Sequence, residues 1–185
     1  MGKSPLSAKA VVDLAMEIVD ESGPGALTLA AVAARAGVAP PSLYKHVRNL
    51  AELRVLVSGR VMEDFAEHAN AAVLGRSGDD AVRALMHAWR SYVQRYPNRY
   101  AAVLQRSEPA TAAAGDRLVD ILVAALRAYD LEGSRAIHAA RCMRAMAHGF
   151  AVLESQGGFQ LPEDLDESYE MLIDMLLCGL RTPRE

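Results

Sequence analysis

The sequence predicts an all-α fold of about nine helices, with a small N-terminal helix-turn-helix head and a larger helical body. Three observations lead to this prediction. Apolar residues recur at intervals of three and four along most of the chain, glycine or proline separates the periodic stretches, and no stretch alternates apolar and polar residues as a strand would. We place the head at residues 1–48 and the body at residues 49–185.

The charge of the chain is unevenly distributed. Hydrophobic residues make up 51% of the 185 residues, which is ample for a core, and the formal net charge is −3. Residues 1–60 carry seven basic and five acidic side chains, whereas the remainder carries 13 basic and 18 acidic ones. A slightly positive head on an acidic body is compatible with a head that contacts a polyanion.

The N-terminal sequence resembles no signal peptide, and no apolar run is long enough to span a bilayer. We therefore expect a soluble, cytoplasmic protein with no membrane partner.

The first predicted helix begins after Ser7, a plausible N-cap, and ends near Gly23. Apolar residues follow the cap at helical spacing, at Val11, Ala15 and Ile18. Residues 1–6 before it are expected to form a loose tail.

Residues 28–48, TLAAVAARAGVAPPSLYKHVR, are predicted to form two short helices joined by a glycine turn. Thr28 is placed to cap the first helix, and Gly37 is the residue type that most easily adopts the left-handed conformation at a helix end. Pro40 and Pro41 fit the open first turn of the second helix, where no N–H donor is lost.

The second short helix has an inward and an outward face. Leu43 and Val47 are four residues apart and point inward, which leaves polar residues outside: Ser42, Tyr44, Lys45, His46 and Arg48. Such a pair of helices is a helix-turn-helix, whose second helix can enter the major groove of DNA. The two basic residues can neutralise phosphates, the tyrosine and histidine can donate to phosphate oxygens, and the serine can reach a base edge.

This stretch resembles the TetR family of bacterial transcription regulators. The matching residues are Gly23, Leu27, Thr28, Ala33, Ala36, Gly37, Val38, Leu43, Tyr44, Lys45 and His46. The chain departs from the family pattern at Val47, where an aromatic residue is usual, and at Leu50, where the family usually has a phosphate-contacting Lys. The alternative is that residues 28–48 form an ordinary corner of an all-α domain.

The resemblance implies a DNA-binding transcriptional regulator that is not an enzyme and needs no cofactor. Its partners would be a double-stranded DNA operator, a second copy of the chain and an unknown small-molecule effector. Repression is typical of the family. A two-fold dimer predicts a near-palindromic operator, and the aromatic and methionine residues of the body predict a small, largely apolar effector whose binding to the C-terminal domain releases the repressor. The implied DNA contacts are Thr28, Ala39, Pro40, Pro41, Ser42, Tyr44, Lys45, His46 and Arg48, and Lys3 of the tail is a further candidate for the DNA backbone.

Two other classes of function remain as alternatives. An enzyme is not supported, because the sequence has no glycine-rich phosphate loop, no recognisable nucleophile motif and no acidic metal cluster. A helical module that binds a protein through residues 28–48 would differ from a DNA-binding protein in its weaker response to salt.

The body is predicted to consist of successive helices. Asn49 caps a long helix that starts beside the DNA-reading helix and runs into the body, so a shift in the body can turn the head. The next helix is expected from Asp79 or Asp80 to Pro97, followed by a short segment at residues 98–106. Three further helices are expected: one that starts after Ser107-Glu108-Pro109, one over residues 134–155, and a last one that starts at the acidic stretch around Asp164.

The middle helices are expected to enclose an effector pocket, because aromatic and methionine side chains gather there. The candidates are Phe65, Met86, Trp89, Tyr92, Tyr96, Tyr100, Met143, Met146 and Phe150. The alternative for each is ordinary core packing.

The last two helices have more apolar surface than one packing partner can cover, which favours a subunit interface. In TetR-like proteins these helices pair with their symmetry mates as a four-helix bundle. The expected dimer residues are Phe150, Leu153, Tyr169, Leu172, Ile173, Leu176 and Leu180. The alternative is packing within one subunit.

The stretch His148-Gly149-Phe150 with Leu153-Glu154 and Gly157-Gly158-Phe159 resembles a TetR subgroup named for a Trp-His-Gly signature, although its tryptophan is absent here.

Cysteine and histidine give few further signals. We expect Cys142 and Cys178 to be reduced thiols of the core, with a redox-sensing pair as the alternative. His138 and Cys142 are four residues apart, which is metal-ligand spacing on a helix, but no third ligand is evident and no metal is expected.

Overall fold

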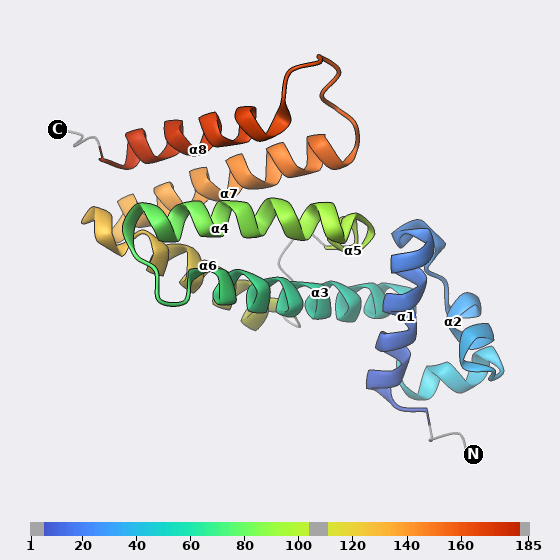
Figure 1. Ribbon diagram of the computed structural model, residues 1–185. Coiled ribbons are helices and arrows are strands. Elements are labelled where there is room, and N and C mark those ends of the chain that lie inside the picture. The colour runs from blue at the N-terminus through green and yellow to red at the C-terminus, as the bar shows by residue number, and fades with distance from the viewer. Residues whose placement is uncertain (1–5, 104–110, 182–185) are drawn as a thin grey trace. The chain divides into compact units, whose positions relative to one another are not determined.

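The computed structural model describes residues 6–103 and 111–181, and these residues form helices and no strand (Figure 1). The α-helices are α1 (Ala8–Ser22), α2 (Leu29–Ala36), α3 (Leu50–Val73), α4 (Gly78–Arg95), α5 (Pro97–Ala101), α6 (Ala112–Ala125), α7 (Gly133–Ser155) and α8 (Leu165–Arg181). Short 3-10 helices are η1 (Pro24–Ala26), η2 (Pro40–Lys45) and η4 (Arg127–Tyr129). The predicted all-α fold is confirmed. Lys3 and Ser107-Glu108-Pro109 lie outside the described residues.

Side chains with short polar groups fix several helix starts. Ser7 Oγ accepts a hydrogen bond from the Ala10 N–H at 3.1 Å, and Asn49 Oδ1 accepts one from the Glu52 N–H at 2.9 Å. These bonds satisfy N–H groups that have no partner inside the helix. Both predicted caps are therefore confirmed. Asp164 plays the same part for α8, since its Oδ1 accepts from the Asp166 N–H at 2.7 Å.

The chain divides into two compact packing units. Unit 1 comprises residues 1–64 and 96–115, and unit 2 comprises residues 65–95 and 116–185. Helix α3 contributes to both, because the boundary falls inside it. This division describes packing, whereas the expected division at residues 48 and 49 concerns function and stays a prediction.

In unit 1, α1 packs against α2, α5 and η1. The core of this unit is aliphatic, and its fully buried side chains include Val11, Val19, Val32, Leu43 and Leu53. Burying this apolar surface is the main force that holds such short helices together, since isolated helices of this length are marginal in water.

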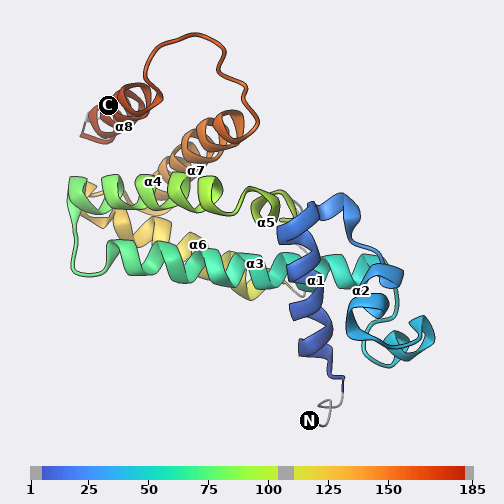
Figure 2. The same cartoon turned by 45° about the vertical axis from the view of Figure 1, so that its right-hand side comes forward.

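In unit 2, α4 packs against α7, which lies beside it in Figures 1 and 2. Helix α4 also contacts α8. Its buried face is nearly continuous and carries Val82, Leu85, Met86, Trp89 and Val93. The hydroxyl of buried Tyr169 in α8 donates to the Met86 carbonyl at 2.6 Å, so this polar group is satisfied inside the core.

The structure corrects one expectation about α7 and α8. Cys142 and Cys178 are both exposed, so the prediction of core thiols is wrong. On the same helix as Cys142, Ile137 is 39% exposed, whereas Met143 and Ala147 are fully buried. Sequence periodicity located the helix but not the exact orientation of its apolar face.

None of the helices within the described ranges has the length and apolar character that a bilayer crossing requires.

Candidate nucleic-acid interface

The corner between α2 and η2 is set by one cap at each end of α2. Thr28 Oγ1 accepts a hydrogen bond from the Ala31 N–H at 3.0 Å, which confirms the predicted N-cap. Gly37 has φ 66° and ψ 38°, the left-handed conformation, and the Val38 N–H then reaches back to the Ala33 carbonyl at 3.0 Å. This is the arrangement that glycine favours at a helix C-terminus, and it turns the chain into η2.

The second helix of the motif is a 3-10 helix rather than the short α-helix that we expected. Ala39 is extended, Pro40 and Pro41 occupy the first turn, and the Ser42 N–H bonds to the Ala39 carbonyl at 2.9 Å. The first four N–H groups of an α-helix have no partner inside it, so a helix of only six residues satisfies more of its donors with 3-10 bonds before α3 begins after Asn49.

The faces of η2 are as predicted. Leu43 is 0% exposed and Val47 is 2% exposed, so both point into the core. Tyr44 is 58% exposed, and the neighbouring Lys45 is also exposed. Of the remaining predicted DNA contacts, Ser42 and His46 are half-buried, while Thr28, Ala39, Pro40, Pro41 and Arg48 are exposed. Residues 39–46 thus present a short, mostly polar surface supported by two buried aliphatic side chains.

Arg48 is paired within its own unit. Its Nε lies 3.1 Å from Glu52 Oε1, and its backbone N–H donates to Glu52 Oε2. These hydrogen bonds, the backbone one first, lower the pKa of Glu52. Because the Arg48 side chain is 84% exposed, the pair is weak and a phosphate oxygen can compete for the guanidinium.

Arg35 joins α2 to α1, a contact that the sequence analysis missed. Its guanidinium donates to Glu21 at 2.7 Å and lies 3.4 Å from Glu17. The hydrogen bond to Glu21 raises the pKa of Arg35, and the same bond lowers the pKa of Glu21. The two glutamates are four residues apart on α1, which was a usable signal for a shared cationic partner.

Arg99 joins α5 to α1 and α3, and this contact was also missed. Its Nε and Nη2 lie 2.6 and 2.7 Å from the carboxylate of Asp20, and its Nη1 lies 3.5 Å from Asp64. The neighbouring Asn98 donates to the Asp20 carbonyl at 3.0 Å. The residues are too far apart in sequence for periodicity to pair them.

The predicted effector residues are divided between the two packing units, and their role stays a prediction. Aromatic rings of unit 2 pack directly on each other, with Phe65 and Trp89 centroids 4.8 Å apart and Phe65 and Tyr92 centroids 5.0 Å apart. Buried in the same unit are Met86, Met143 and Phe150, while Met146 is half-buried. The two remaining candidates, Tyr96 and Tyr100, belong to unit 1.

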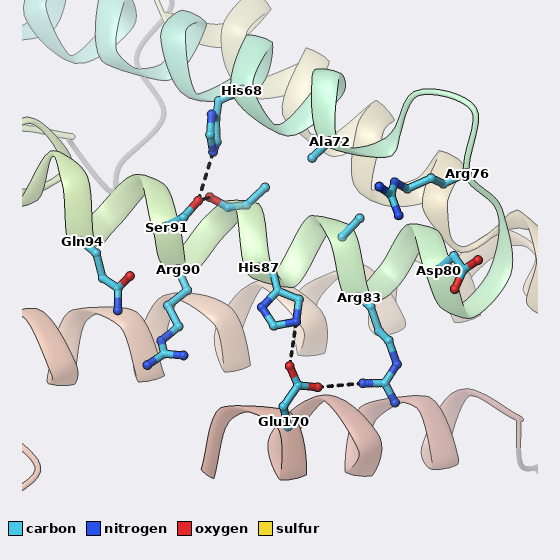
Figure 3. Close-up of a pocket in the computed structure, with 12 residues that line it drawn as sticks. His68, Ala72, Arg76, Asp80, Arg83, His87, Arg90, Ser91, Gln94 and Glu170 are labelled. Carbon is cyan, nitrogen blue, oxygen red and sulfur yellow. Dashed lines mark hydrogen bonds and ion pairs between the residues drawn. The ribbon is translucent and has the colours of Figure 1, made fainter. Parts of the chain in front are cut away.

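A groove of about 690 Å³ runs along α4 between α3 and α8, and none of the nine predicted effector residues lines it (Figure 3). Its lining is polar. Glu170 of α8 lies 2.8 Å from His87 Nε2 and 2.9 Å from Arg83 Nη1, and His68 Nε2 lies 3.2 Å from Ser91 Oγ. Polar residues recur every three or four positions on this face of α4, a pattern that sequence analysis takes for an ordinary solvated face.

Arg90 is a buried cation at the inner edge of this groove. It is 7% exposed, its Nε and Nη2 lie 2.7 and 2.6 Å from the Glu154 carboxylate, and its Nη1 lies 2.7 Å from Asp166. The hydrogen bond to Glu154 is the main reason that the pKa of Arg90 is raised. The guanidinium also stacks 4.9 Å from the centroid of the Tyr169 ring, so one side chain links α4, α7 and α8.

The residues expected at a dimer interface divide by exposure. Phe150, Tyr169, Ile173 and Leu176 are buried within their own subunit. Leu153 is 49% exposed, and Leu172 and Leu180 are half-buried, so these three have surface available for a partner. The dimer interface stays a prediction. Of the seven residues predicted for it, these three have surface with which to contact a partner directly.

Two protein families match the chain. The family described as "Bacterial regulatory proteins, tetR family" matches residues 11–54, which contain the helix-turn-helix. The family described as "Tetracyclin repressor-like, C-terminal domain" matches residues 82–176.

Individual proteins resemble the chain over nearly its whole length. The uncharacterized HTH-type transcriptional regulator YobS of Bacillus subtilis is 34% identical over 178 residues, covering 95% of this chain and 93% of the relative. The uncharacterized HTH-type transcriptional regulator Rv0681 of Mycobacterium tuberculosis is 35% identical over 176 residues, covering 93% and 79%. The solved structure of a protein with unknown function from Rhodococcus sp. RHA1 has a TM-score of 0.81 at 20% identity, covers 97% of this chain and 98% of that one, and so shares the fold.

Proposed function

The chain belongs to the tetR family of bacterial regulatory proteins, which are DNA-binding transcriptional regulators and not enzymes, and from this premise we propose that it is a repressor. In this proposal a homodimer binds a near-palindromic operator and leaves it when a small effector binds the C-terminal domain. The observation that carries the proposal is the exposed surface of residues 39–46, supported by buried Leu43 and Val47.

The proposed DNA contacts are divided by chemistry. Lys45 supplies a charge for a phosphate, Tyr44 and His46 supply donors, and Ser42 is placed to reach a base edge. Arg48 contributes to DNA binding when a phosphate replaces Glu52 as the partner of its guanidinium. Thr28 caps α2 at its N-terminus, where the helix dipole also favours an anion.

A two-fold dimer explains why the operator would be near-palindromic. Two heads related by a two-fold axis present the same η2 surface to two half-sites, about one helical turn of DNA or a small multiple apart. In the proposal exposed Leu153 and half-buried Leu172 and Leu180 supply apolar contacts between the subunits.

Release from DNA is a population shift. The effector binds better to a conformation in which the heads have the wrong spacing, and only this difference in affinity drives release. Helix α3 is the proposed route, because it contributes to both packing units. Arg99 and Asp20 would then carry a movement of α3 or α5 to α1, since they join these helices within unit 1. A coupling of about 3 kcal/mol corresponds to roughly a hundredfold change in operator affinity.

The effector is proposed to be largely apolar and to use the aromatic cluster of Phe65, Trp89 and Tyr92. These rings are in contact, so the effector has to part them, and its apparent affinity is reduced by the cost of that opening. Trp89→Ala should therefore alter the effector response more than DNA affinity without effector. The reverse pattern would remove Trp89 from the site.

The experiment that tests the DNA-binding surface starts with selection of bound fragments from random and genomic DNA. Tyr44→Ala and Lys45→Ala are then titrated with the selected duplex by fluorescence anisotropy, at several salt concentrations. Each should weaken binding by roughly tenfold, and Lys45→Ala should reduce the log–log salt slope by about 1, because it removes one phosphate contact.

The matched control is Arg117→Ala on α6, which removes one exposed positive charge from unit 2 rather than from the proposed interface. It should bind DNA like the unmodified protein. If Tyr44→Ala and Lys45→Ala also bind normally while remaining dimeric, η2 is not the DNA-reading segment.

A further inference from the structure

The groove along α4, of about 690 Å³, already holds a carboxylate, and that carboxylate belongs to the protein itself. Glu170 of α8 extends into the groove, with its Oε1 2.8 Å from His87 Nε2 and its Oε2 2.9 Å from Arg83 Nη1 (Figure 3). The two donors are one helical turn apart on α4, and their spacing fits the two oxygens of a single carboxylate.

Glu170 is held only weakly in this position. Its side chain and that of His87 are each 48% exposed, and that of Arg83 is 36% exposed. Exposed ion pairs contribute little net stability, because water solvates both partners when they separate. Arg83 also pairs with Asp174, so α8 keeps a link to α4 when Glu170 leaves. The carboxylate of a ligand can therefore replace that of Glu170 at small cost.

The groove also offers room for the body of a ligand. Its volume is within the range of about 300–1,000 Å³ that is common for small-molecule sites. Three small side chains contribute to its lining, Ala72 from α3 and Ala84 and Ala88 from α4. The two on α4 directly follow Arg83 and His87 in the sequence, so apolar surface lies beside both donors. An apolar body that covers this surface adds affinity to that of the carboxylate.

The charges of the groove favour an anionic ligand. Its lining combines three arginines and two histidines with two carboxylates, those of Asp80 and Glu170. Neither carboxylate pairs with exposed Arg76, which lines the groove on the α3 side (Figure 3). Arg90 adds little to this attraction, because its own carboxylate partners on other helices neutralise it. The positive charge available to a ligand is therefore that of Arg76, together with the two donors now bound to Glu170.

We propose that this groove binds a small organic acid, whose carboxylate displaces Glu170 from Arg83 and His87 and whose apolar body lies against the three alanines. The position of Glu170 shows that a planar group with two oxygens fits both donors at once. The expected ligand is therefore a carboxylic acid with a short aromatic or aliphatic body.

This site is separate from the surfaces proposed above. All of its lining residues belong to unit 2, and they include none of the nine predicted effector residues and none of the seven predicted dimer residues. The proposal does not rest on repression or on DNA binding, since its test measures ligand binding directly.

The test is a titration of the full chain with benzoate, and with benzamide as a neutral ligand of the same shape, followed by NMR of the histidine rings. The chain has five histidines, and the variants His68→Gln and His87→Gln assign the two signals of the groove. Benzoate should shift both signals saturably at roughly 1–10 mM, the range expected for so small a ligand. The signals of His138 and His148, which do not line the groove, should stay unchanged. Benzamide should bind at least tenfold more weakly, because it lacks the charge.

Two variants separate a ligand site from an ordinary surface ion pair. Arg83→Gln should lower the affinity for benzoate roughly tenfold, because it removes a charged donor. Glu170→Gln should raise the affinity roughly threefold, because it removes the carboxylate with which benzoate competes. Structural damage would not raise the affinity, so this increase is specific to displacement.

The matched control is Glu167→Gln, which removes the same charge from an exposed residue of α8 that does not line the groove. It should bind benzoate like the unmodified protein. Three results would overturn the proposal. The first is the absence of a saturable shift with benzoate, and the second is equally tight binding of benzamide. The third is an affinity that does not rise in Glu170→Gln, or that rises equally in Glu167→Gln, because no internal carboxylate would then be displaced.

Discussion

At the scale of single residues, the DNA-reading corner depends on the backbone of Gly37. Its φ of 66° lies in the left-handed region, where an L side chain is strained, and this conformation lets the Val38 N–H reach the Ala33 carbonyl. The turn places η2 with Leu43 inside and Tyr44 outside. A single backbone conformation therefore orients the polar surface that follows it.

Gly37→Ala should lower the free energy of unfolding by about 1 kcal/mol, because alanine pays the left-handed strain that glycine avoids. Chemical denaturation followed by circular dichroism measures this. Gly25→Ala is the control, since that glycine has no left-handed φ and a Cβ there meets nothing within 4 Å. Equal losses in the two variants would show that the strain at residue 37 is not the cause.

His148 gives a pH dependence with a definite sign. Partial burial lowers its pKa, and nearby Arg144 adds to the effect. The unfolded state therefore binds the proton more readily, so this histidine's contribution to stability is present above its unfolded pKa and is lost as the pH falls through its lowered folded pKa. Unfolding titrations between about pH 8 and pH 5 should show a flatter decline in His148→Gln than in the unmodified protein. An unchanged decline would contradict this assignment.

At the scale of elements, two arginines on α4 differ in environment although both pair with carboxylates. Arg90 is buried against Glu154 and stacks on Tyr169, and it links three helices. Arg83, two turns earlier, pairs with Glu170 and Asp174 of α8 at the surface. Removing a partner from a buried pair leaves an uncompensated charge inside the protein, whereas water replaces the partner of an exposed one.

Arg90→Ala should therefore lower the free energy of unfolding by about 3 kcal/mol, and Arg83→Ala by less than about 1 kcal/mol. Both are measured by denaturant unfolding at neutral pH. A small effect at Arg90 would mean that Glu154 finds other partners, such as Gln94, which already donates to it at 3.0 Å.

At the scale of the whole molecule, the apolar surface left on α7 and α8 is what a second subunit would cover. Leu153 is 49% exposed, and Met171 and Met175 are each 60% exposed. Exposed apolar side chains that gather on neighbouring helices favour an interface over isolated surface residues. The homodimer of the proposed repressor rests on this surface.

Leu153→Asp and Leu172→Asp should each weaken the dimer at least tenfold, because each places an unpaired charge in an apolar contact. Analytical ultracentrifugation measures the dissociation constant, and operator affinity should fall with it. Leu74→Asp is the control, since Leu74 is 79% exposed at the end of α3 and lies outside the predicted interface. Intact dimers in both α7 and α8 variants would require another interface.

The sequence predicted those features of the fold that depend on neighbouring residues alone. The caps at Ser7, Thr28 and Asn49, the glycine turn at residue 37 and the buried pair of Leu43 and Val47 all follow from residue type and spacing. The long-range pairs did not follow, because nothing local links Arg99 to Asp20 or Arg90 to Glu154. The 3-10 form of η2 was missed because residue types mark where a helix starts, but not whether so short a segment forms 3-10 or α-helical bonds.

The effector candidates show the same limit. Large apolar side chains at helical spacing signal burial, and burial is what the structure shows for Phe65, Trp89 and Tyr92. Whether buried rings pack on one another or enclose a ligand depends on the tertiary arrangement, which periodicity does not contain. The polar groove along α4 was missed for the opposite reason, since its residues resemble any hydrated helix face.

Helix α3 is one uninterrupted helix from Leu50 to Val73, and it contributes residues to both packing units. Successive residues of an α-helix are rotated by about 100° around its axis. A single insertion or deletion within α3 would therefore turn the side chains after it by about 100° relative to those before it. We therefore expect natural variants of this chain to keep the length of α3 constant and to vary in length at the turns, such as residues 156–164. Insertions of seven residues, close to two full turns, should be tolerated better than insertions of one or two.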